Sequence, residues 1–127
     1  MTEARYRGDQ ASLYSPVIVS HIVERVTGDL PDNTRLAEVF AFVFDLPPRT
    51  FFDTQSGTAP SIIHRTLLNG VKGLMRAGFS NVAEVRNTKP AELVDIFWER
   101  NPQAKMTINR AEFIVAVFSG PEAKLMA

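Results

Sequence analysis

The first regular pattern of apolar residues begins after Ser15, in the segment SPVIVSHIVERVTGD. Its apolar positions follow one face of a helix, and Ser15-Pro16 and Gly28 are typical start and stop signals. Almost all of these apolar residues are valine or isoleucine, however, and β-branched side chains favour strands because they lose rotamer freedom in a helix. We therefore predict a strand at 17–23, and a helix over the same residues is the competing interpretation.

Two later segments are also short and rich in β-branched or aromatic residues. Residues 82–86 (VAEVR) fit a short strand or a single helical turn. Residues 112–118 (EFIVAVF) form a run typical of a fully buried strand that ends before Gly120-Pro121. Periodicity alone also allows a helix here, beginning after a cap at Thr107.

Three other segments have the spacing and end signals of helices. Residues 34–45 follow polar capping residues and stop before two prolines, and residues 90–100 carry a proline in their first turn. Residues 61–76 fit a helix with apolar residues near helical spacing. Its interior glycines, Gly70 and Gly73, each weaken such a helix by about 1 kcal/mol, so we expect a break near Gly70.

The alternation of these elements predicts an α/β (mixed α+β) fold, with a small sheet of about three to four strands covered by about three helices. An all-α bundle is the alternative. The length of 127 residues is close to the usual size of one domain, and apolar residues occur along the whole chain. We predict one globular domain over 14–127 and a flexible N-terminal arm over the polar residues 1–13.

The predicted helix at 34–45 is apolar on almost every side. A helix without a polar face is buried on both sides or forms an interface with another molecule. Phe40, Phe42 and Phe44 are therefore candidate interface residues, and a place in the core of the domain is the alternative for them.

Charge is distributed unevenly along the chain although the net charge is zero. Residues 1–60 contain five arginines and eight acidic residues, whereas residues 61–127 contain nine basic and six acidic residues, so the halves carry −3 and +3. Such a dipole can steer an anionic partner or favour head-to-tail self-association. It is far from the strongly basic character of a dedicated nucleic-acid-binding protein.

Composition also limits the compartment. The chain contains no cysteine, which excludes disulfides, thiolate chemistry and cysteine-ligated metal sites. No apolar run approaches the roughly 20 residues of a membrane span, and the N-terminus lacks the order of a signal peptide. We expect no membrane contact and a cytoplasmic location, or a location inside a virus particle assembled in the cytoplasm.

The sequence contains no recognisable enzyme signature. His21 and His64 each lie within an apolar stripe without a second ligand at helical spacing, so we interpret both as core or boundary residues. A nucleophile elbow, a Walker loop and a dinucleotide-binding fingerprint are all missing from the sequence. We predict that the protein is not an enzyme and uses no metal or other cofactor.

The stretch NGVKGLMRAGFSNVAEVRN, from Asn69 to Asn87, has the composition of a phosphate-binding site. Its GVKG segment resembles the Gly-x-x-Gly loop of KH domains, in which glycines let the backbone approach nucleic-acid phosphates and a basic residue supplies charge. Together with the local excess of basic residues, this predicts a nucleic-acid-binding surface. The candidate residues are Gly70, Lys72, Gly73, Arg76, Arg86 and Lys89.

The overlapping segment LMRAGFSNVAEVRNTKPAELVDI, from Leu74 to Ile96, resembles helix-hairpin-helix modules of the kind found in the C-terminal domain of the RNA polymerase α chain. The resemblance lies in the order of leucine, alanine-glycine, valine and a later glutamate-leucine pair. In that family a second hairpin with Gly-x-Gly contacts the DNA backbone, but the corresponding segment ERNPQAKMTINRAE has no glycine. The resemblance therefore implies a similar packing of helices, without that DNA contact.

A further resemblance concerns the whole chain. The start MTEARYRGDQASLYSPVIVSHIVERV, the alternation of NVAEVR, TKPAELVDIFWERN and AEFIVAVF, and the end PEAKLMA resemble the small assembly-cofactor protein of the double-stranded RNA bacteriophages, the cystoviruses. That family implies a non-enzymatic, dimeric protein that helps the polymerase-containing core to assemble and to package RNA.

Two functional hypotheses follow. The first is a non-catalytic assembly or adaptor protein, whose partners are a second copy of the chain and shell or polymerase proteins, with weak RNA contact. The second is a small nucleic-acid-binding module that contacts phosphates through the basic C-terminal half.

Overall fold

The computed structural model describes residues 16–51 and 57–126, with side chains described as far as Ser119, and the arm predicted at 1–13 lies outside this range. Two elements join directly at the start, α2 (Pro16–Ile22) and the π-helical turn η1 (Val23–Thr27). The other elements are α3 (Leu36–Asp45), the 3₁₀ turn η2 (Pro48–Phe51), α4 (Pro60–Arg76), α5 (Val82–Arg86), α6 (Pro90–Arg100), the 3₁₀ turn η3 (Pro102–Ala104) and α7 (Ile108–Met126).

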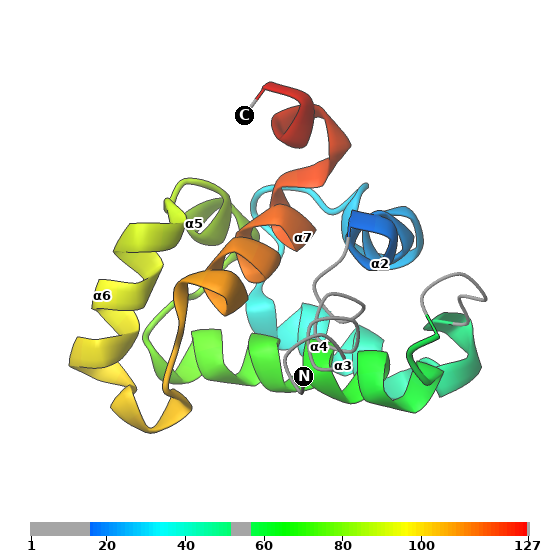
Figure 1. Cartoon of the computed structure of the whole chain (residues 1–127), viewed down its shortest axis with the longest axis horizontal. Helices are drawn as coiled ribbons and strands as arrows, with labels where there is room; N and C mark the ends of the chain where they lie inside the picture. The colour runs from blue at the N-terminus through cyan, green and yellow to red at the C-terminus, as the bar shows by residue number, and fades with distance from the viewer. Residues whose placement is uncertain (1–15, 52–56, 127) are drawn as a thin grey trace, which may run out of the picture.

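The described residues form helices and no sheet (Figure 1). Their β-type pairing is limited to one isolated antiparallel bridge, between Arg35 and Asn81. The predicted mixed fold with a small sheet is therefore wrong, and the alternative, an all-α arrangement, describes this part of the chain. Among the described helices, none is long and apolar enough to cross a membrane.

A single apolar core connects the helices. Figure 1 shows α3 and α4 along the lower edge of the molecule, with α2, α5 and α7 above them and α6 at the left side. Burial of each large apolar side chain contributes about 1.5–3 kcal/mol relative to leaving it in water. The largest completely buried side chains are Phe51, Phe97, Phe118, Ile18, Ile22, Leu36, Ile63, Leu74 and Leu93.

Residues 17–23, predicted as a strand, form α2 and the first residue of η1. Ile18, Val19 and Ile22 are buried on one face of α2, as the helical spacing requires. The helix penalty of a β-branched residue is below about 1 kcal/mol, which is less than the gain from burying its side chain. In η1, Gly28 N donates to Val23 O over 2.7 Å, a bond across five residues that widens the turn.

Residues 82–86, the second predicted strand, form the short helix α5. Two side chains at its start bond each other's backbone: Glu84 N donates to Asn81 Oδ1 (3.0 Å), and Asn81 N donates to Glu84 Oε1 (3.3 Å). This capping box satisfies backbone groups that a short helix leaves unpaired. Local polar bonds therefore decide the structure of a segment whose apolar pattern is ambiguous.

Residues 112–118, the third predicted strand, lie within α7. Arg110 N donates to Thr107 Oγ1 (3.2 Å), so the Thr107 cap considered from the sequence is present. Ala111, Ile114 and Phe118 are buried at spacings of three and four residues, which is a helical stripe. The run is buried on most sides, and a run of this kind does not distinguish a strand from a helix.

The three predicted helices are confirmed, as α3, α4 and α6, within one or two residues of the expected ends. The expected break near Gly70 is wrong, because α4 continues through it to Arg76. After α4, Phe79 N donates to Leu74 O (3.0 Å) and Gly78 N to Met75 O (3.0 Å). Gly78 has φ of +96°, so this glycine end is a Schellman motif.

A proline inside α7 explains one of a pair of unusual contacts. Pro121 has no N–H, so the carbonyl of Val117, four residues earlier, lacks its helical donor. The buried Thr27 Oγ1 donates to Val117 O, and Arg86 Nε donates to Phe118 O. The hydroxyl of Thr27 therefore satisfies the carbonyl that the proline leaves without a donor, Arg86 bonds the carbonyl beside it, and α7 changes direction near its end (Figure 1).

We expect Thr27→Val to lower the free energy of unfolding by about 1–3 kcal/mol, because it leaves the buried carbonyl of Val117 without a donor. In a Pro121→Ala background the new N–H can bond that carbonyl, so the cost of Thr27→Val should fall by at least about 0.5 kcal/mol. Urea denaturation of the four proteins of this cycle measures the coupling.

Thr88→Val is the matched control, since Thr88 Oγ1 donates to Glu84 O (2.7 Å) within its own exposed helix end. Its effect should add to that of Pro121→Ala without coupling. Equal costs of Thr27→Val in both backgrounds would contradict the role assigned to Thr27.

Candidate functional site

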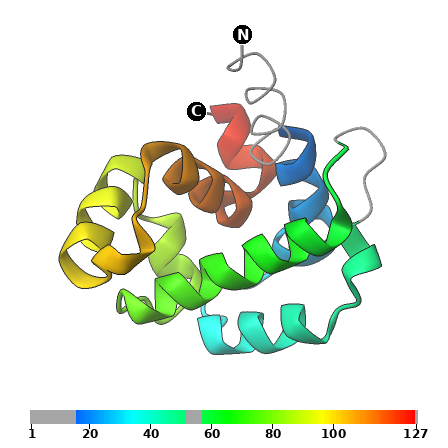
Figure 2. The ribbon, with the colours of Figure 1, turned by 60° about the horizontal axis from the view of Figure 1, so that its bottom comes forward.

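The helices α3 and α4 form a layer along one edge of the molecule, and Figure 2 brings this edge forward. His64 Nε2, near the start of α4, lies 2.7 Å from Val43 O, near the end of α3. At the other end, Leu36 N donates to Ser80 O (2.9 Å) just after α4 ends. The two helices are therefore antiparallel neighbours, and each turns one face away from the core.

The outward face of α4 carries a row of basic and polar side chains. Arg65, Asn69, Lys72 and Arg76 are all exposed and follow one another at spacings of four, three and four residues. They lie opposite the buried Leu67 and neighbouring core residues. We call these four residues the basic row.

The charges of the basic row are not neutralised within the described part of the chain. Arg65, Lys72 and Arg76 take part in no side-chain hydrogen bond or ion pair there; the described ion pairs are Arg25–Glu24 and Arg86–Asp32. The sequence of α4, PSIIHRTLLNGVKGLMR, contains no acidic residue. Three exposed cations therefore share one helix face without a counter-charge on that helix.

Gly70 and Gly73, predicted to approach phosphates, lie on a different side of α4. A Cβ added to Gly73 would lie 3.3 Å from Phe97 Cε2, and one added to Gly70 would lie 3.9 Å from Ile114. Gly73 thus lets the Phe97 ring of α6 lie against α4, whereas Gly70 leaves room for a Cβ at an ordinary contact distance from Ile114 of α7. Both glycines belong to a continuous helix and do not form the expected loop.

Arg86, another predicted phosphate contact, is engaged inside the protein. Its guanidinium donates to Leu30 O (2.9 Å), Asp32 Oδ1 (2.7 Å) and Thr27 O (3.3 Å), besides the bond to Phe118 O. Arg86 therefore joins α5 to α7 and to the loop after η1. A side chain held by these bonds is not available to an external phosphate.

The structure separates the remaining predicted cations. Lys72 and Arg76 lie together in the basic row. Lys89 is exposed just before α6, whereas Arg100, at the other end of α6, donates to Ala77 O (3.4 Å) beside the end of α4. Eleven residues separate Lys89 from Arg100, which is about 16 Å along a helix, so Lys89 is not part of the row.

Arg65 was not among the predicted site residues. The signal that reveals it is the repeat of basic or polar residues at positions 65, 69, 72 and 76 within one helix. The expected break near Gly70 conceals this repeat, because it divides the helix between the second and third members.

The three candidate interface phenylalanines of α3 differ in exposure. Phe44 is 65% exposed and Phe42 is 48% exposed, whereas Phe40 is partly buried against the core. The rings of Phe40 and Phe44 stack with centroids 6.2 Å apart. Phe42 and Phe44 therefore do not fill the core, and because they are two residues apart on α3 they present apolar area on different sides of that helix.

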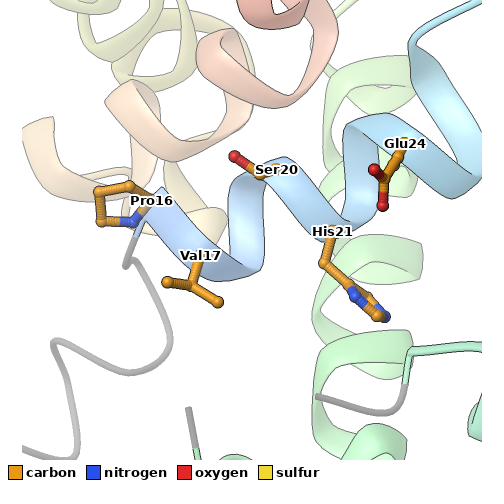
Figure 3. A pocket seen from close by; sticks show the side chains of 5 residues that line it. All are labelled: Pro16, Val17, Ser20, His21 and Glu24. Atoms are coloured by element: carbon orange, nitrogen blue, oxygen red, sulfur yellow. The ribbon is translucent and has the colours of Figure 1, made fainter. Parts of the chain in front are cut away.

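A shallow hollow beside α2 is lined by Pro16, Val17, Ser20, His21 and Glu24 (Figure 3). The side chains of Ser20 and His21 point in different directions, so they form no nucleophile–base pair. His21 Nε2 lies 3.3 Å from Thr50 O and, facing a carbonyl, acts as the donor. Both histidines thus bond backbone carbonyls as half-buried boundary residues, as the sequence indicates.

Among the described residues, no group of three or more histidine and acidic side chains is placed to hold a metal ion. No protein-family model, curated protein or solved structure shows significant similarity to the chain. The choice of a functional surface therefore depends on the geometry of this molecule.

We expect Gly70→Ala to stabilise the protein by up to about 1 kcal/mol, because alanine favours the helix and its Cβ meets Ile114 at an ordinary contact distance. Gly73→Ala gains the same helix propensity but presses on the Phe97 ring, so its net effect should be near zero or destabilising. Urea denaturation measures both. A loss of nucleic-acid binding in Gly70→Ala, with stability unchanged, would instead restore the phosphate-contact interpretation.

Proposed function

We propose that the protein is a non-enzymatic binding module that contacts the phosphate backbone of a nucleic acid through the outward face of α4. The observation that supports this proposal is the basic row, with three exposed cations and no ion-pair partner among the described residues. Lysine and arginine held on a rigid helix bind phosphates by replacing the counterions of the nucleic acid.

The spacing of the row suits a phosphate backbone. At 1.5 Å per residue, Arg65 and Lys72 are about 10 Å apart along the helix and Lys72 and Arg76 about 6 Å. Phosphates follow one another along a strand at about 3.4 Å of axis per nucleotide, so the row covers several consecutive phosphates. Contacts of this kind carry no base information, and we expect binding that is independent of sequence.

An adaptor function is the second candidate, and the exposure of Phe42 and Phe44 favours it. Large aromatic side chains are enriched at protein interfaces because they bury much area at little conformational cost. The resemblance to cystovirus assembly cofactors points the same way. This candidate uses the exposed aromatic side chains of α3.

We expect the affinity for a 20-base-pair DNA duplex to fall about 40-fold between about 50 and 200 mM salt, as three phosphate contacts require. In Lys72→Ala, which removes one contact, the decrease over the same range should be about 12-fold. Fluorescence anisotropy of an end-labelled duplex, repeated with a duplex RNA and a second sequence, measures both values.

Lys89→Ala is the matched control, because it removes the same charge from an exposed position outside the row. It should leave the salt dependence close to that of the unchanged protein. If Lys89→Ala and Lys72→Ala weaken binding equally, the basic row is not the contact surface and the attraction is a property of overall charge.

A further inference from the structure

We propose that a second copy of this chain covers the α3–α4 layer, with α3 of each copy lying against the basic row of the other. Part of this inference rests on the proposed function, because the same cations would then serve either a second copy or a nucleic acid. The proposal is based on the complementary side chains of α3 and α4.

The outward face of α3 carries acids and apolar side chains and no basic residue. Glu38 and Asp45 are both exposed and seven residues apart. Beside them a second row, Ala37, Ala41 and Phe44, is also exposed and wholly apolar. The face therefore offers two negative charges about 10 Å apart next to an apolar strip.

The outward face of α4 has the opposite charge at the same spacing. Arg65 and Lys72 are also seven residues apart, and both are exposed. Leu68 and Met75, on the neighbouring side of α4, are partly buried apolar residues that can extend the apolar strip of α3. An α3 face laid on an α4 face thus pairs each acid with a base and brings apolar surface together.

The antiparallel order of α3 and α4 allows this contact to occur twice. The bond between His64 and Val43 O places the end of α3, with Asp45, beside the beginning of α4, with Arg65. A two-fold axis that runs parallel to α3 and α4, between them on their outward face, lays α3 of the second copy over α4 of the first. The same axis lays α4 of the second copy over α3 of the first, so the contact occurs twice. Asp45 pairs with Arg65 of the second copy, and Glu38 pairs with Lys72.

In this dimer Phe44 lies near the centre and the charged pairs lie at the rim. Exposed ion pairs contribute little affinity each, but they fix the register and disfavour alternatives in which like charges meet. The apolar centre supplies the association free energy. The dimer and a bound nucleic acid exclude each other, since both occupy Arg65 and Lys72.

The test is a charge exchange followed by sedimentation velocity over a concentration series at about 50 mM salt. Glu38→Lys/Asp45→Lys and Arg65→Glu/Lys72→Glu should each weaken self-association at least about tenfold, because like charges then face one another. An equal mixture of the two variants should form a heterodimer, since every pair is again of opposite charge. Recovery in the mixture also shows that both variants are folded.

The control variant is Glu92→Lys/Asp95→Lys, with the same charge change on the exposed face of α6. It also matches the capping role of Glu38, whose Oε1 accepts from Arg35 N (3.1 Å), because Glu92 Oε1 accepts from Lys89 N (2.9 Å). Its self-association should equal that of the unchanged protein. A monomer at every concentration, a dimer indifferent to the exchange, or a mixture that stays monomeric would each overturn the inference.

The same experiment separates this inference from the proposed function. Excess 20-base-pair duplex should convert the dimer into a complex of monomer and duplex, and a duplex bound to an intact dimer would show that Arg65 and Lys72 are not covered. A dimer that obeys the charge exchange but ignores the duplex would support the inference and reject nucleic-acid binding. A monomer that binds the duplex would give the opposite result.

Discussion

The packing of α3 against α4 determines which surfaces of this protein remain free. On another side of α4, Gly73 lets the Phe97 ring come nearer than an added Cβ would favour, whereas a Cβ at Gly70 would meet Ile114 at an ordinary contact distance. With α3 on a second side and the core on a third, a single face of α4 stays in water. The basic row occupies that face, so the buried contacts of α4 and its exposed cations are two consequences of one helix position.

Much of the helical structure could be predicted from the sequence, because three segments combine helical spacing with clear end signals. The predicted sheet is wrong because that prediction ranks the strand preference of valine and isoleucine above the helical spacing of the apolar positions in residues 17–23 and 112–118. Their preference for strands is worth less than the burial of a correctly spaced stripe. The structure of α5 is decided by polar groups, because Asn81 and Glu84 form reciprocal hydrogen bonds at its start. The spacing of apolar residues gives no information about such bonds.

The candidate site was predicted in part. Lys72 and Arg76 lie on the exposed surface as expected. The sequence could not show that Arg86 is unavailable to a phosphate, because the groups that accept its hydrogen bonds lie up to 59 residues away in the chain. Arg65 was overlooked for a related reason: it joins the row only if α4 is continuous through Gly70. Exposure of Phe42 and Phe44 likewise depends on how α3 sits on the core, which periodicity does not determine.

The bonds around the proline of α7 link positions that lie far apart in the chain. Thr27 bonds the carbonyl of Val117, which Pro121 leaves without its helical donor, and Arg86 bonds the neighbouring carbonyl of Phe118. In evolutionary terms we expect positions 27 and 121 to vary together. A lineage that replaces Pro121 with a residue that has an N–H no longer needs the hydroxyl at 27, whereas a lineage that keeps the proline must keep a donor beside it.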